Sequence, residues 1–209
     1  MKYYLSSFRI GNESEKLKSM AQSGNKRVAY ISNAVDYLED DEFRTMIETN
    51  DICDLQELGL EVNTVDLREY FDKTRKLEEK MKEFDIIWIT GGNVFVLLQA
   101  MKLSGLDSII VNWHDQNVDK IYGGFSAATY VLAPELKGMH LVDDQNEKPY
   151  GEEHQTIWNG LGILDYVIVP HYKSEHFESD AVEEAIQYFI DNKVHFKALR
   201  DGEVIVIDS

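Results

Sequence analysis

The feature that most constrains this chain is a recurrence of short apolar runs, rich in β-branched and aromatic residues, with helical patterns between most of them. Such runs predict strands at residues 2–6, 27–32, 61–66, 85–90, 120–124 and 166–169. The runs DIIWIT and YVIVP are apolar on both faces, which is typical of central strands in a parallel sheet. The strand–helix alternation therefore predicts a doubly wound, mostly parallel α/β sheet.

The helical patterns have the period of an amphipathic helix. Leu106, Ile109, Ile110 and Trp113 fall at i, i+3, i+4 and i+7. A similar stripe runs over residues 182–190, and we expect Ser179 to cap that helix.

Two segments depart from this rhythm. Residues 137–160 are polar and lack clear periodicity, which predicts a functional loop or a small excursion with its own hairpin. The C-terminal stretch VHFKALRDGEVIVID predicts two strands joined as a hairpin at Asp201-Gly202.

Composition narrows the function classes. A length of 209 residues favours one domain, 1–209, with a sizeable core. A net charge of −17 argues against nucleic-acid binding and against an anionic membrane surface. The single cysteine, Cys53, excludes an internal disulfide and a cysteine-rich zinc site. Because the N-terminal apolar run is too short for a signal peptide and no run reaches the ~18 apolar residues of a membrane span, we expect a cytoplasmic protein.

Chemistry-bearing residues follow three of the predicted strands. Gly91-Gly92-Asn93 follows DIIWIT, Ser126 follows the run at 120–124, and His171 follows YVIVP. Ligands of open α/β sheets bind outside the carboxyl ends of the strands, so we expect these residues to share one edge. A glycine pair, a serine and a histidine are the inventory that acyl transfer requires.

The serine lies among small residues. Gly124 and Ala128 suit a tight strand-to-helix elbow that exposes the Ser126 hydroxyl. The helix after it would aim the Ala127 N–H and its dipole at developing negative charge. Gly91-Gly92 could supply a second N–H, and Asn93 would cap the helix that begins at Val94.

Each of these signals also has an ordinary explanation. Gly-Gly-Asn is a common turn after a strand, a serine among small residues arises by chance, and His171 could be a loop histidine. Their combination at three strand ends favours the functional interpretation. The carboxylate that would orient His171 stays open among Asp143, Asp144 and Asp201, because a triad is defined by geometry and not by chain order.

The chain resembles the peptidase E (aspartyl dipeptidase) family, whose fold is flavodoxin-like and similar to class I glutamine amidotransferases. The resemblance rests on ITGGNVFVLLQAM, GGFSAATYVLAPEL, VPHYKSEH and ALRDGEVIVID. It implies an oxyanion contribution from Gly91-Gly92, Ser126 as nucleophile and His171 as base. It makes Asp201 a candidate third member, with Asp143 or Asp144 as the alternative.

The chain departs from the family pattern at two places. Ala128 stands where the elbow motif usually has glycine. Aspartate-cleaving members carry an arginine after the histidine, whereas no arginine occurs here between Arg75 and Arg200. Lys173 is the nearest cation, and we therefore expect weak or absent preference for aspartate.

The sequence as a whole predicts a serine-type peptidase that hydrolyses small peptides through an acyl-enzyme, without metal or cofactor. The expected catalytic residues are Ser126, His171 and Asp201, ahead of Asp144. The expected oxyanion donors are Gly91, Gly92 and Ala127, and the expected substrate-binding residues are Asn93 and Lys173. The alternatives are a cyanophycinase-like hydrolase and a non-catalytic binding member of the fold, which the geometry of Ser126 and His171 would separate.

Overall fold

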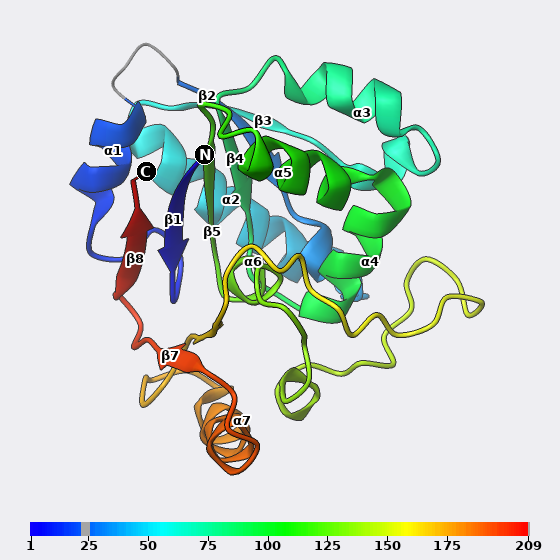
Figure 1. The fold of residues 1–209 in the computed structure, drawn as a ribbon. Helices are drawn as coiled ribbons and strands as arrows, with labels where there is room; N and C mark the ends of the chain where they lie inside the picture. The colour runs from blue at the N-terminus through cyan, green and yellow to red at the C-terminus, as the bar shows by residue number, and fades with distance from the viewer. Residues whose placement is uncertain (22–25, 209) are drawn as a thin grey trace.

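A six-stranded sheet forms the centre of the molecule (Figure 1). The computed structural model describes residues 1–21 and 26–208. The strand order is β3-β2-β4-β5-β1-β8, and every strand runs parallel to its neighbours except β8, which is antiparallel to β1. The strands are β1 (Lys2–Ser6), β2 (Arg27–Ile31), β3 (Glu61–Thr64), β4 (Ile86–Ile89), β5 (Ile121–Phe125) and β8 (Val204–Ile207).

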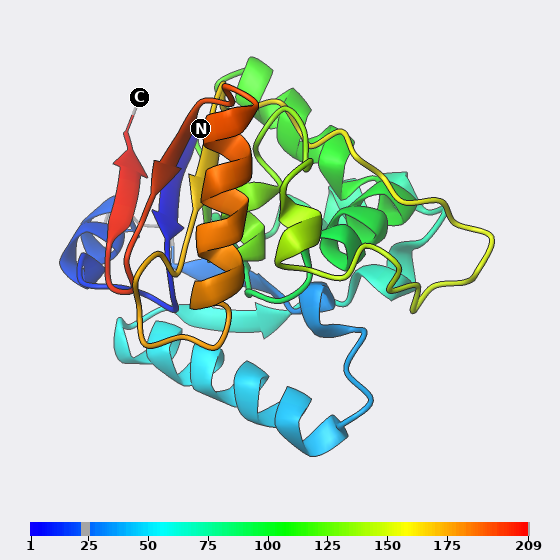
Figure 2. The same ribbon diagram turned by 90° about the horizontal axis from the view of Figure 1, so that it is seen from below.

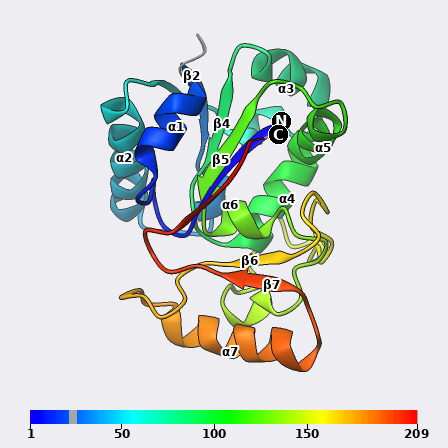
Figure 3. The ribbon, with the colours of Figure 1, turned by 60° about the vertical axis from the view of Figure 1, so that its left-hand side comes forward.

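Helices cover both faces of this sheet, as Figure 3 shows. On one face lie α1 (Ser14–Ala21) and α2 (Asp41–Glu57), and on the other α3 (Thr74–Met81), α4 (Val94–Ser104) and α5 (Leu106–Asp115). The predicted doubly wound α/β fold is therefore confirmed. Short helical segments occur at Asn33–Val35, Leu67–Tyr70, Ala127–Tyr130 (α6) and Met139–Leu141.

The alternation of side chains along each strand builds two cores. Ile87 and Ile89 of β4 pack into the cluster under α3, α4 and α5, whereas Ile86 and Trp88 pack into the cluster under α1 and α2. Successive side chains of a strand point to opposite faces, so a strand that is apolar throughout is buried on both sides. The run DIIWIT behaves as its pattern predicted.

A second, two-stranded parallel sheet lies beside the central one. It pairs β6 (Val167–Val169) with β7 (Phe196–Ala198), and α7 (Ser179–Asp191) connects them (Figure 3). The predicted pair of C-terminal strands and the turn at Asp201-Gly202 are present, but the two strands pair with different partners. β7 joins β6 and β8 joins β1, so the turn carries the chain from one sheet to the other.

One local prediction was wrong, and of the two alternatives for residues 137–160 the structure shows a loop rather than a hairpin. Ser179 is the first residue of α7, and the capping position belongs to Glu178, whose side chain makes no cap hydrogen bond. Residues 137–160 hold a short 3₁₀ turn, and an isolated antiparallel bridge between Glu135 and Asn159 closes the base of the excursion, which carries no strand pair among its described residues. Figure 2 shows this excursion extending from the body on the side away from β8.

Across residues 1–21 and 26–208, no single helix is long and apolar enough to cross a membrane. The helices α4 and α5 taken together are long and apolar enough by length and composition alone, but the two are bent by 84° relative to each other.

Candidate active site

Ser126 occupies a strained elbow between β5 and α6. Its φ of 48° and ψ of −113° are unusual for a residue with a side chain, and such conformations cost on the order of 1–3 kcal/mol. Gly124 makes this bend possible, because an added Cβ would lie 2.3 Å from Ile89 O and 2.6 Å from the Ala128 Cβ. Ala128 therefore fits the elbow in place of glycine, provided that position 124 has no side chain.

His171 and Asp201 come together because they follow the two paired strands of the small sheet. His171 Nδ1 lies 2.8 Å from Asp201 Oδ1. Ser7, directly after β1, connects both residues: its Oγ donates to Asp201 Oδ1 at 2.8 Å and accepts from the His171 N–H at 2.9 Å. The N–H of Asp201 donates to Ser174 Oγ at 2.8 Å. Asp201, rather than Asp143 or Asp144, is thus the carboxylate that orients the imidazole.

The imidazole is held in the neutral form near neutral pH. Burial first, and then the charge of the neighbouring His176, lower the pKa of His171 to about 4 against the opposing effect of Asp201. A carboxylate oxygen accepts hydrogen bonds, so Nδ1 carries the proton and Nε2 presents its lone pair. This is the tautomer that a general base requires.

Ser126 and His171 line one cavity of about 400 Å³, together with Gly91 and Gly92. Ser126 is 7% exposed, and its Oγ makes no hydrogen bond to any residue that the structure describes. Catalytic hydrogen bonds are often long in unliganded enzymes and tighten with substrate. Ser126 and His171 therefore line the same cavity without a hydrogen bond between their side chains.

Backbone N–H groups beside Ser126 are free to bind an oxyanion. A Cβ added to Gly91 would lie 3.1 Å from the Ser126 Cβ, so this glycine packs directly against the elbow. Within residues 1–21 and 26–208, the N–H groups of Gly91, Gly92 and Ala127 donate to no protein acceptor. The α6 helix after Ser126 is only one turn long, Ala127–Tyr130, so its dipole is weaker than the sequence suggested.

The expected substrate-binding residues lie elsewhere. Asn93 caps α4, as predicted, by accepting from the N–H groups of Phe95 and Val96, and its Nδ2 donates to Asp144 O at 2.8 Å. Both ends of this buried amide are occupied, and it does not line the cavity. Lys173 is exposed, with its Nζ 5.1 Å from the centre of the Tyr172 ring, and it does not line the cavity either.

Asp144 and Asp143 both have structural partners. Asp144 Oδ1 accepts from the N–H and the Nδ2 of Asn146 within its own turn, so its expected catalytic role is not supported. Asp143 is buried, and its Oδ2 accepts from the Val94 N–H at 2.8 Å. Burial raises the pKa of Asp143 to about 8, with a further contribution from Glu178.

The sequence did not point to several residues around His171. The His176 ring stacks on the His171 ring with centroids 3.7 Å apart, and Glu178 Oε2 lies 3.8 Å from His171 Nε2. Phe8 contacts both histidine rings edge-on. Ligands of open α/β sheets bind at the carboxyl ends of strands, and this strand-end rule, applied to β1, would have pointed to Ser7 and Phe8. His176 and Glu178 carry no such signal, because they lie in an irregular loop.

A metal ion could be held by His171, His176 and Glu178, whose ligand atoms lie within 4.8 Å of one another. The two imidazole planes are nearly parallel, at 7°, and stacked. One ion cannot lie in both ring planes, and a tetrahedral site therefore requires one ring to turn. The orientation of His171 toward Asp201 fits a general base better.

The chain combines an α/β fold with a serine at a strained elbow, a histidine oriented by an aspartate, and free N–H groups beside one cavity. This arrangement is typical of proteins with a serine–histidine–aspartate site at a sheet edge. Peptidase family S51 matches residues 7–209, and the chain belongs to this family.

Curated relatives resemble part of the chain. The chain is 28% identical to an uncharacterized peptidase of Listeria monocytogenes over 53% of its own length and 50% of the relative's, and 28% identical to one of Pasteurella multocida over 60% and 56%. The chain thus spans about half the length of these curated relatives.

The fold resembles a crystal structure from Listeria monocytogenes described as a candidate peptidase E, with a TM-score of 0.75, 20% identity and coverage of 100% of this chain and 98% of that one. It also resembles a peptidase from an acI-B1 actinobacterium, with a TM-score of 0.72, 17% identity and coverage of 99% and 82%. At these identities the likeness concerns the fold.

Proposed function

We propose that this protein hydrolyses small peptides as a serine exopeptidase, with Ser126 as nucleophile, His171 as base and Asp201 as the group that orients the base. The observation that carries the proposal is the His171–Asp201 hydrogen bond of 2.8 Å beside a cavity that also contains the strained Ser126 elbow. Structural packing alone does not require a buried neutral imidazole and a strained serine at one cavity.

The chemistry follows from these positions. His171 Nε2 takes the Ser126 proton while Oγ attacks the substrate carbonyl. The N–H groups of Ala127 and of Gly91 or Gly92 bind the oxyanion, and the leaving amine takes its proton from His171. Water, activated by the same imidazole, then releases the acyl group and restores Ser126.

A non-catalytic binding protein is the second candidate. It is favoured by one observation, which is that Ser126 Oγ makes no hydrogen bond to His171 in the described structure. Strain at Ser126 and a desolvated base would then have no chemical use, so we rank this candidate lower.

The test is turnover of a set of dipeptides and amino-acid anilides by wild type and by Ser126→Ala. Removing the hydroxyl leaves the elbow intact and should lower kcat by about 10³-fold or more. Ser108, exposed on α5, offers the matched control, and Ser108→Ala should keep wild-type kinetics. Equal turnover by wild type and Ser126→Ala would refute the proposed nucleophile.

A further inference from the structure

Large exposed apolar side chains gather at the cavity that contains Ser126. Phe8, Phe43, Met46 and Phe177 are 40%, 46%, 50% and 88% exposed, and all of them line it. Among the described residues, Ile190 is the other large apolar side chain with comparable exposure, and it lies away from the cavity. Exposed apolar side chains that cluster around one cavity mark a binding surface.

The apolar lining continues inward from three separate parts of the chain. Phe8 comes from the segment after β1, Phe43 and Met46 come from α2, and Phe177 comes from the loop after β6. Phe125, the residue before Ser126, is buried at the inner wall and meets the Phe8 ring edge-on. An apolar path therefore leads from the mouth of the cavity to the proposed nucleophile.

The charged groups of the cavity oppose an acidic side chain. Arg9 is the one arginine or lysine among the described residues that line it, and Asp54 binds its guanidinium by two hydrogen bonds of 2.8 and 2.7 Å. The carboxyl groups of Asp51, Glu175 and Glu178 line the same space. An aspartate side chain would need a free cation there, preferably the fork of an arginine.

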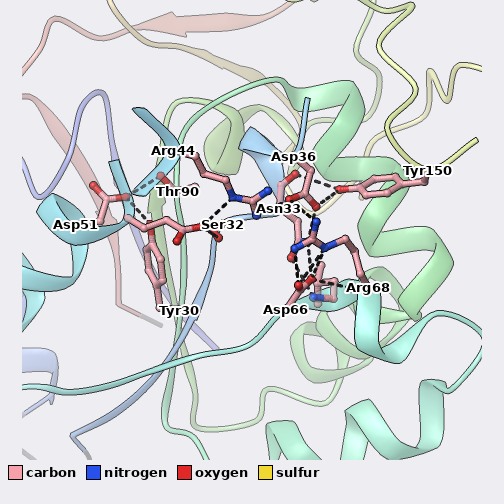
Figure 4. A network of polar contacts seen from close by, with 12 residues as sticks. Tyr30, Ser32, Asn33, Asp36, Arg44, Asp51, Asp66, Arg68, Thr90 and Tyr150 are labelled. Carbon is pink, nitrogen blue, oxygen red and sulfur yellow. Dashed lines mark hydrogen bonds and ion pairs between the residues drawn. The ribbon is translucent and has the colours of Figure 1, made fainter. Parts of the chain in front are cut away.

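Neighbouring arginines are also engaged by carboxylates (Figure 4). Arg44 binds Asp36 and Glu48, and Arg68 binds Asp66. Neither arginine lines the cavity. Asp51, which also lines the cavity, accepts hydrogen bonds from the Tyr30 and Thr90 hydroxyls on one carboxylate oxygen.

We infer that the preferred substrate carries a large apolar or aromatic side chain on the acyl residue of the cleaved bond, and that acidic residues are disfavoured there. This inference rests on the proposed peptidase function and adds its substrate class. The apolar side chain would lie against Phe8, Phe43, Met46 and Phe177.

The experiment compares kcat/KM for four p-nitroanilides that differ only in the acyl residue: Phe, Leu, Ala and Asp. Burying a side chain of this size in an apolar site predicts values for Phe and Leu at least about tenfold above Ala, with Asp the lowest. The double variant Phe43→Ala/Met46→Ala should reduce the Phe-to-Ala ratio by about tenfold, because it removes two apolar walls. The control Ile190→Ala removes an exposed apolar side chain away from the cavity and should leave the ratio unchanged.

The outcomes separate the two proposals. Turnover that depends on Ser126 but is as fast for Asp as for Phe overturns the inference and leaves the peptidase function standing. An unchanged Phe-to-Ala ratio in the folded double variant also overturns it. Folded wild-type protein that turns over none of the four substrates and no dipeptide overturns the peptidase function and the inference with it.

Discussion

Asp201 holds the His171 imidazole by Nδ1, which leaves Nε2 to take a proton. Asp201→Asn keeps the shape but presents the wrong hydrogen-bonding pattern to the ring, so we expect kcat/KM to fall by about 10³–10⁴-fold. Asp144→Asn alters a side chain that, among the described residues, accepts hydrogen bonds only from Asn146, and the variant should stay within about twofold of wild type in the same assay. The reverse ranking would make Asp144 the catalytic acid.

The protonation of His171 should set the acid limit of activity. Burial first, and then the charge of His176, lower the pKa of His171 to about 4, while Asp201 opposes them. Because the base acts only when neutral, kcat/KM should rise with pH through about 4 and be level above it. His176→Phe keeps a ring on His171 but removes the opposing charge, so the acid limb should move to higher pH. A limb that does not move would show that His176 has no electrostatic effect on the base.

At the scale of the elements, α4 owes its start to Asn93. Its side chain accepts from two N–H groups of the first turn, and its amide ties the helix to Asp144 O. Loss of such a cap costs about 0.5–2 kcal/mol, so Asn93→Ala should lower the free energy of unfolding by about that amount in a urea titration. Asn93→Asp keeps the cap and should lose less. KM for all substrates should be unchanged in both variants, because a raised KM would restore the substrate-binding role.

Sequence patterns predicted the strands themselves better than they predicted which distant strands pair with one another. The central strand β4 could be predicted because its side chains are apolar on both faces, whereas YVIVP shows the same pattern but forms β6 in the small sheet. The partner of β7 could not be predicted, since the Asp201-Gly202 turn fits a hairpin equally well, and only the position of β6 decides the pairing. That pairing is what brings Asp201 to His171.

The same limit applies to the candidate site. Ser126, His171, Gly91 and Gly92 follow strands, so the strand-end rule found them. Residues of α2 and Glu178 line the cavity only because of how the helices and loops pack against the sheet, and local sequence patterns do not encode this packing. The absence of an arginine after His171 could be seen in the sequence, but the sequence could not show that Arg9 lines the cavity and is bound by Asp54.

For the whole molecule, Asp143 should link stability to pH. Burial raises its pKa in the folded state to about 8, with Glu178 contributing, whereas the unfolded value is ordinary. The folded protein therefore binds the extra proton, and this group's stabilisation is complete at low pH and is lost as pH rises through about 8. Asp143→Asn keeps an acceptor for the Val94 N–H but does not titrate.

Urea titrations of both proteins from pH 4 to 8.5 provide the measurement. Wild type minus Asp143→Asn should give a difference in unfolding free energy that becomes steadily less favourable to wild type as pH rises. A pH-independent difference would contradict the buried, protonated state of Asp143.

The account depends most directly on Ser126 being a nucleophile that His171 activates. Wild-type protein treated with a fluorophosphonate and digested for mass spectrometry should carry a single adduct, on the peptide that contains Ser126. Ser126→Ala should show none, and His171→Ala should react at least about 10²-fold more slowly. An adduct on another serine such as Ser7, or no adduct on Ser126 in protein that remains folded, would contradict the account.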